Sequence, residues 1–236
     1  MGDTGRPPAL LHVGHDEAKA AFLGELEAFL HVASDLDDRE LLAASRCQGW
    51  NVAEVIVHVH LGLQEMLLGI VTPADAEPDT DAAGYWQSPV PATDTGADQL
   101  DAMRFVQRLG AAYRRPTGAV GHLRPTARGI QTATRAIALG AVRFQGHVLT
   151  TGDFLATWAV ELAVHHLDLG RELDLQPPAP PALRLARATV EALAGDALPA
   201  SWSDETAIAV GAGRLPLDPR QHQEAGALAD RLPVLG

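Results

Sequence analysis

Apolar side chains recur every three or four positions in two stretches near the start of the chain. In the first stretch, residues 15–32, the spaced apolar residues are Ala20, Phe22, Leu23, Leu26, Phe29 and Leu30. In the second stretch, which follows Trp50, they are Val52, Val55, Val59, Leu63 and Leu67. This period matches one face of an α-helix, so both stretches are predicted to be amphipathic helices that bury one side.

The same spacing predicts three further helices, at about residues 98–114, 127–139 and 151–173. Pro116 and Pro125 precede the helix predicted at 127–139. A proline ring removes a backbone donor and clashes with the preceding helical turn, so it disfavours the interior of a helix. We therefore expect that helix to begin only after Pro125.

The end of the chain has a different pattern. Prolines crowd residues 177–181 and form a stiff linker. Beyond the linker we expect a helix at about 183–194, short strands at 206–210 and near Leu215, and a last short helix. The pattern thus predicts a mainly α fold: a helical bundle followed by a small C-terminal α+β domain at residues 182–236.

Local signals support two of the helix starts. Asn51 is a suitable N-cap, and Glu54 three residues later completes the pattern of a capping box. Thr151 and Asp153 suit the first turn of the last long helix. Residues 72–97 form a long polar loop, in which Tyr85 and Trp86 either close over a ligand or simply anchor a linker.

Composition narrows the class of protein. Apolar residues make up 47% of the chain and aromatic residues only 5%, which favours helices packed by small aliphatic side chains over a β-sandwich. The net charge of −12 argues against binding nucleic acid or an anionic membrane surface. The sequence has no run of about 18 uncharged apolar residues, so we predict no membrane-spanning segment. Residues 1–9 show no secretion signal, so we expect a cytoplasmic protein.

Candidate chemistry is concentrated in the last long helix. Glu161 and His165 are four residues apart, so they stand on one helix face about 6 Å apart at Cβ. That spacing lets a carboxylate oxygen and an imidazole nitrogen meet one metal ion at about 2.0 to 2.2 Å. Asp168 lies almost in line with Glu161 and is either a group that orients a ligand histidine or a plain surface acid.

A third ligand must come from another element, and His58 in the second apolar helix is the best candidate. His60 and His166 neighbour the chosen histidines but point to other sides of their helices. Glu54 is also four residues from His58, although capping is the simpler account of it. Three protein ligands leave an open position on the ion, as in catalytic zinc sites; iron and nickel remain alternatives.

The chain contains one cysteine, Cys47, which excludes an internal disulfide and a CxxC motif. Cys47 is either a nucleophile or a structural residue of the turn before the second helix. No base stands beside it in the sequence, which favours the structural interpretation.

Two motifs resemble the mycothiol-dependent maleylpyruvate isomerase family. The stretch from Cys47 to His58 places a histidine eight residues after the Gly-Trp that opens a helix. The later Glu161-x-x-x-His165-x-x-Asp168 is similar to the family's second motif, whose Glu and His complete a metal site. The resemblance covers about residues 10–172.

This resemblance implies a DinB-like four-helix bundle over residues 10–172 that holds a divalent ion, usually zinc. The open coordination position would receive the thiol of a low-molecular-weight cofactor, mycothiol, and the partners would be this thiol and a small substrate. The family's isomerases use an arginine of the C-terminal domain for substrate, and Arg214 and Arg220 are the candidates in that region.

Three functions compete at this stage. The first is a metal-dependent, thiol-using transferase or isomerase that acts on a small electrophile. The second is a metal-binding protein without turnover, such as a sensor or sequestering module. The third is a hydrolase that uses a water molecule activated by the metal. We expect no catalytic residue beyond the metal site itself.

Overall fold

The structure is a computed structural model, and it describes residues 10–87 and 96–235. The helices of this part of the chain are α1 (His15–Asp35), α2 (Val52–Ile70), α3 (Gly96–Ala112), α4 (Thr117–Ala136), α5 (Thr151–Leu169), α6 (Pro180–Ala194), α7 (Asp204–Gly211) and α8 (Pro219–Ala225). The strands are β1 (Pro73–Ala74), β2 (Ala141–Phe144) and β3 (His147–Thr150), and short 3₁₀ helices lie at η1 (Glu40–Leu42), η2 (Gly84–Gln87) and η3 (Gly226–Arg231).

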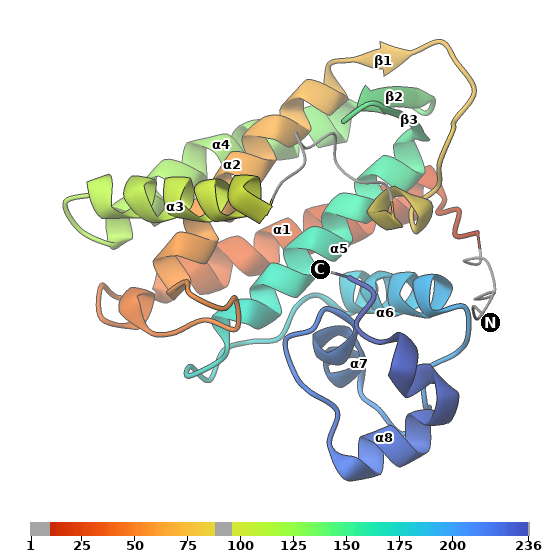
Figure 1. The fold of residues 1–236 in the computed structure, drawn as a ribbon. Helices are drawn as coiled ribbons and strands as arrows, with labels where there is room; N and C mark the ends of the chain where they lie inside the picture. The colour runs from red at the N-terminus through yellow and green to blue at the C-terminus, as the bar shows by residue number, and fades with distance from the viewer. Residues whose placement is uncertain (1–9, 88–95, 236) are drawn as a thin grey trace.

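Four long helices form the core of the molecule. α1 packs along α5 and α2 packs along α4, while α3 lies against α2 (Figure 1). Nearly all of α5 is buried, because it has neighbours on several sides. The mainly α class and the four-helix bundle are therefore confirmed.

The start of α2 matches its sequence signal. The Asn51 side chain accepts a hydrogen bond from the backbone N–H of Glu54 at 2.9 Å, and the Glu54 carboxylate accepts one from the Asn51 N–H at 2.8 Å. This capping box fixes where the helix begins and therefore how its faces are oriented. Gly49, in the turn just before it, has a φ of +86°, a left-handed conformation that favours glycine.

Two expectations about the helices are wrong. α4 begins at Thr117 and runs through Pro125, because its apolar side (including Leu123 and Ile130) is buried and this burial offsets the lost hydrogen bond. Residues 206–210 belong to helix α7 and are not a strand. The Ser203 side chain caps that helix by accepting from the Thr206 N–H, and this local capping outweighs the β-branched pattern.

The described residues form one sheet, and it lies at one end of the bundle and not in the C-terminal part. β1, β2 and β3 are antiparallel in that order, with Ala141 opposite Thr150 and Phe144 opposite His147. The hairpin between β2 and β3 turns through Gln145 and Gly146, whose φ values are +45° and +86°. Two left-handed residues are what a type I′ hairpin turn requires. The strand expected near Leu215 is not found there.

The C-terminal helices pack onto the bundle. α6 contacts α5 and α1, and α7 lies against α6 and α5 (Figure 1). α6 starts at Pro180, so part of the expected linker is helical, with proline at the first positions where it is tolerated. The domain boundaries 10–172 and 182–236 stay predictions. Residues 1–9, on which the expected absence of a secretion signal rests, and part of the loop at 72–97 fall outside the described residues.

One helix in the described part of the chain, α2, has the length and hydropathy that a membrane crossing needs. Half of that apolar stretch is buried inside the bundle. Core helices of globular bundles share this composition, and α2 carries two histidines in its middle.

Candidate metal centre

The structure brings His58, Glu161 and His165 together. Glu161 and His165 come from successive turns of α5, and His58 faces them from α2. The Nε2 atoms of His58 and His165 lie 3.3 and 3.1 Å from the same carboxylate oxygen, Oε1 of Glu161. The rings of His58 and His165 meet edge to face with their centroids 4.7 Å apart. Two helices that are far apart in sequence thus aim three donor atoms at one point.

These donors suit a metal ion of the zinc class. All three ligand atoms lie within 4.8 Å of one another. Donors that hold an ion at about 2.0 to 2.1 Å in tetrahedral directions are themselves separated by about 3.3 to 3.4 Å. The measured separations to the Glu161 oxygen, 3.1 and 3.3 Å, are close to this value. Two imidazoles and one carboxylate therefore fit such an ion in both chemistry and spacing.

Electrostatics favour a negative charge at the centre of the site. Burial by itself would raise the pKa of Glu161, but His165 and His58 beside it hold that pKa well below its usual range. Burial likewise opposes charge on His165, while the Glu161 and Asp168 carboxylates raise its pKa well above the ordinary value. Glu161 is therefore an anion. It stabilises either protonated forms of the two histidines or a metal cation bound between them.

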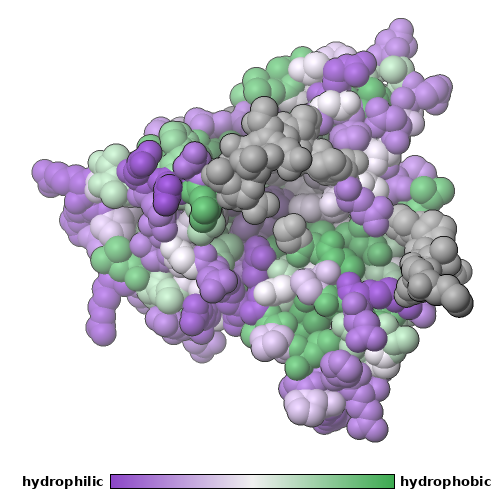
Figure 2. Space-filling view, viewed as in Figure 1, coloured by the Kyte–Doolittle hydropathy of each residue, from purple (hydrophilic) through white to green (hydrophobic). Residues whose placement is uncertain are grey.

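One side of the site is open. The side chains of His58 and Glu161 are 35% and 29% exposed, whereas that of His165 is only 7% exposed. On the face drawn in Figure 2 the surface is hollowed between α2 and α3 on one side and the C-terminal helices on the other. The Trp50 ring lies beside that of His58, with centroids 5.2 Å apart and the two planes tilted by 44°.

A wall of the same region is built from Trp158 and Gly62. Trp158 stands one turn before Glu161 on α5, and its six-membered ring lies against Gly62 of α2, where an added Cβ would approach it to 3.2 Å. The indole Nε1 of Trp158 is buried without a hydrogen-bond partner among the described residues. This large apolar side chain therefore packs between α5 and α2, one helical turn before Glu161.

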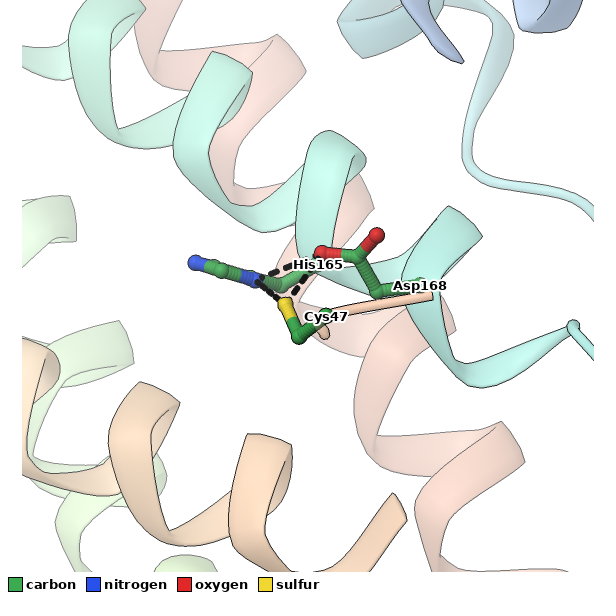
Figure 3. A group of neighbouring side chains, drawn as sticks. All are labelled: Cys47, His165 and Asp168. Carbon is green, nitrogen blue, oxygen red and sulfur yellow. Dashed lines mark hydrogen bonds and ion pairs between the residues drawn. The ribbon is translucent and has the colours of Figure 1, made fainter. Parts of the chain in front are cut away.

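The other face of His165 meets a second group of side chains. Its Nδ1 lies 3.0 Å from Oδ2 of Asp168 and 3.9 Å from Sγ of Cys47. The Cys47 thiol in turn donates to Oδ2 of Asp168 at 2.9 Å. Figure 3 shows one ring nitrogen of His165 facing Cys47 and Asp168 while the other points away from them. Asp168 therefore contacts a candidate ligand histidine, and Cys47 is buried in the same cluster.

Arg214 joins this cluster from the C-terminal part of the chain. Its Nε donates to Oδ1 of Asp168 at 3.1 Å, and its Nη2 lies 3.8 Å from the Cys47 sulfur. Arg220, the other arginine singled out from the sequence, pairs with Glu224 of its own helix and has an exposed side chain. Nothing in the local sequence links Arg214 to Asp168, since the contact depends on how α7 packs against α5.

The alternative ligands lie elsewhere. Glu54 caps α2, as its position suggested. His60 lies beside His122 of α4, with ring centroids 4.5 Å apart, and both burial and His122 lower its pKa. His166 points toward α1, where its Nδ1 lies 2.7 Å from Oε1 of Glu25. The helical period correctly separated these histidines from the site.

The loop aromatics are anchored by the sheet. The Tyr85 hydroxyl donates to Oε1 of Gln145 at 2.6 Å, and its ring lies near Phe144. Burial, together with the negative charges of Glu161 and Glu65, raises the pKa of Tyr85. These contacts fit the anchoring interpretation for Tyr85, and the Trp86 ring packs edge to face against Tyr85 with centroids 5.6 Å apart.

The fold and the site define a helical bundle with a candidate metal centre between two of its helices. A family model described as the mycothiol maleylpyruvate isomerase N-terminal domain matches residues 22–170. The chain belongs to this family, as its two motifs indicated. No curated protein matches the chain.

Two solved structures share the fold. They are crystal structures of the mycothiol-dependent maleylpyruvate isomerase and of a single-residue mutant of it, with TM-scores of 0.53 and 0.54. Each is 15% identical in sequence, and each match covers 75% of this chain and 70% of the other. At this identity the likeness speaks for the fold.

Proposed function

We propose that this protein binds one divalent metal ion, zinc, through His58, Glu161 and His165. With that ion it uses a low-molecular-weight thiol, mycothiol, to act on a small electrophilic substrate as an isomerase or S-transferase. Family membership supports the thiol and the reaction class. The convergence of three donor atoms within 4.8 Å, with one side open, is the observation that carries the proposal.

The metal supplies one chemical property. A bound zinc ion lowers the pKa of a coordinating thiol, so that the thiol is deprotonated near neutral pH. A thiolate adds to an electron-poor double bond, after which rotation and elimination give the other geometric isomer; displacement of a leaving group gives a transferase instead.

The residues of the chain prepare the site for this chemistry. Glu161 provides one negative charge, so a divalent ion leaves a net positive centre that favours an anionic sulfur or a carboxylate-bearing substrate. The indole of Trp50 packs beside the ring of His58, and Trp158 packs between α5 and α2 one turn before Glu161. The partial exposure of the His58 and Glu161 side chains, 35% and 29%, supports an approach of both reactants from that side of the site.

The test combines metal content with turnover. Purified protein is reconstituted with zinc, assayed for bound metal by elemental analysis, and mixed with maleylpyruvate in the presence and absence of mycothiol. We expect about one ion per chain and isomerisation that requires the thiol. The variant His58→Ala should lose both, whereas His31→Ala, which removes an exposed histidine of α1, should lose neither.

The outcomes separate the competing functions. Failure to retain zinc would overturn the proposal. A stoichiometric ion without any thiol-dependent reaction on a panel of electrophiles would favour a metal-binding protein without turnover. Hydrolysis of activated esters that is indifferent to mycothiol would favour the hydrolase.

A further inference from the structure

The two ring nitrogens of His165 face different groups, and only Nε2 is one of the three candidate ligand atoms. Its Nε2 faces Glu161 at 3.1 Å, on the side of the candidate metal. Its Nδ1 faces Asp168 at 3.0 Å, on the side of the C-terminal helices. A histidine that ligates a metal through one nitrogen carries a proton on the other, and an acceptor for that proton fixes the tautomer and the orientation of the ring.

Asp168 is fully buried and gathers three donors. Its Oδ2 accepts from His165 and from the Cys47 thiol at 2.9 Å, and its Oδ1 accepts from Nε of Arg214 at 3.1 Å. The guanidinium of Arg214 lies directly against this buried carboxylate and offsets its charge. A buried anion persists only with such compensation, and Arg214 is the permanent cation among these donors.

Cys47, His165 and Asp168 also have the geometry of a metal-ligand group, so a second ion must be considered. Arg214 makes that use unfavourable. Its guanidinium contacts both the carboxylate of Asp168 and the sulfur of Cys47, so the cation that such a site needs is already present. The 2.9 Å between the sulfur and the carboxylate oxygen is a hydrogen-bond distance that calls for a thiol proton.

The Arg214 side chain is itself held in place. Its Nη1 donates to the carbonyl of Ala212 at 2.8 Å, and its backbone N–H donates to the carbonyl of Ala209 at 2.7 Å. Gly213 before it turns the chain with a φ of +67°. The end of α7 thus points the guanidinium at the C-terminal end of α5.

We propose that Arg214 is a positioning residue of the metal centre, which acts through Asp168 to fix the orientation and proton position of His165. Cys47 completes the network as a thiol donor. The C-terminal part of the chain supplies none of the three candidate ligands. It contributes to the site through Arg214, which contacts Asp168 on the side of His165 that faces away from the metal position. This inference rests on the proposed metal function, and it gives Arg214 a role that does not depend on contact with substrate.

The first test measures zinc affinity by competition with a chelator, in the full chain. Arg214→Met should weaken zinc binding about 10- to 100-fold, as expected when a partner that orients a ligand is lost. Arg214→Lys should recover part of the loss, because it restores the charge but not the Nε geometry. The control Arg184→Met removes an exposed arginine of α6 and should leave the affinity unchanged. Unchanged zinc affinity in Arg214→Met would overturn the proposal.

The second test needs no metal, so it separates this inference from the proposed function. In the metal-free protein, the Nδ1–H proton of His165 should give a hydrogen-bonded NMR signal that exchanges slowly with water. The signal should persist in Arg184→Met and be lost or exchange rapidly in Arg214→Met and Asp168→Asn. Since Cys47 is the only cysteine, its reaction with a thiol reagent reports on the same network and should be faster in Arg214→Met.

The two tests together leave a definite result. If the wild type binds no zinc but the His165 signal responds to Arg214→Met, the proposed function fails and the positioning contact stands. If zinc binds and neither affinity nor signal responds in a variant that keeps its helical circular dichroism, Arg214 is not a positioning residue. If Arg214→Met loses its helical circular dichroism, the test uses Arg214→Lys instead. Unchanged zinc affinity and an unchanged His165 NMR signal in Arg214→Lys would also overturn the proposal.

Discussion

Glu25 of α1 and His166 of α5 form a fully buried pair, with 2.7 Å between Oε1 and Nδ1. The second oxygen of Glu25 accepts from the backbone N–H of Ala179, just before α6, at 2.6 Å. One carboxylate therefore joins two bundle helices to the start of the C-terminal part. His165 and His166 are adjacent in sequence but serve opposite sides of α5, because successive helical residues are turned by about 100°.

Loss of this carboxylate should destabilise the fold. Glu25→Ala leaves the His166 Nδ1 and the Ala179 N–H buried without their acceptor, at a cost of about 2 to 5 kcal/mol. Urea unfolding followed by circular dichroism measures the change. Glu27→Ala, at an exposed position of the same helix, is the control and should change stability by less than about 0.5 kcal/mol. Equal effects of the two variants would contradict the tethering role of Glu25.

The start of α5 tolerates no side chain at Gly152. A Cβ there would lie 2.1 Å from the carbonyl oxygen of Val13, a contact with backbone that cannot rotate away. Gly152→Ala should therefore lower the free energy of unfolding by more than about 2 kcal/mol. Gly129→Ala in α4 meets nothing within 4 Å and should instead stabilise the protein by about 0.5 to 1 kcal/mol. Thermal melts should show a lower Tm for Gly152→Ala and a higher Tm for Gly129→Ala than for the wild type.

Zinc should stabilise the wild type and not a variant that lacks the carboxylate ligand. At a free concentration of about 100 times the dissociation constant, a ligand adds about 2.7 kcal/mol, or about 5 to 10 °C in Tm for a chain of this size. Glu161→Gln keeps the shape of the side chain but removes its charge, so its Tm should stay the same when zinc is added. An equal rise in Tm for both proteins would place the ion elsewhere.

The pH dependence of stability should carry a small contribution from His12. The hydrogen bond to Asp153 raises the pKa of His12 above its ordinary value, against a weaker opposing effect of burial. The folded protein then binds this proton more tightly than the unfolded chain. The stabilisation is complete below the unfolded pKa of about 6.5 and is lost as the pH rises through the folded pKa.

His12→Gln isolates that contribution. The difference in unfolding free energy between wild type and variant should be larger at about pH 5.5 than at about pH 8.5. The ring is 63% exposed, so solvent screening keeps the effect well under about 1 kcal/mol. A difference that grows with pH would mean that His12 is bound as the neutral form.

Part of the site could be predicted from spacing, and part could not. Glu161 and His165 share a face because the helical period requires it, and Asn51 and Glu54 fix the start of α2 through local hydrogen bonds. His58 is predicted as the third ligand from its place in the second apolar helix, and the resemblance between motifs supports it. Its contact with Glu161 spans 103 residues of sequence, and no local rule predicts that the two helices meet there.

Other features were hidden for the same reason. The hairpin at 141–150 has a recognisable signal in its Gln145–Gly146 turn between apolar residues, which the helical patterns around it outweighed. The β-branched run at 206–210 suggested a strand, although a serine cap and two acidic residues favoured helix α7. Pro125 suggested a break that the burial of α4 overrides.

The sequence by itself determined the long helices α1, α2, α3 and α5, the capping box of α2 and the face on which each candidate ligand stands, because these depend on interactions between residues a few positions apart. Only the tertiary structure decided that His58 meets the Glu161 face, that Cys47 and Arg214 converge on Asp168, and that Glu25 ties α1 to α5. Those contacts depend on how buried helix faces pack, and packing sums many weak contacts between distant segments that no single stretch of sequence encodes.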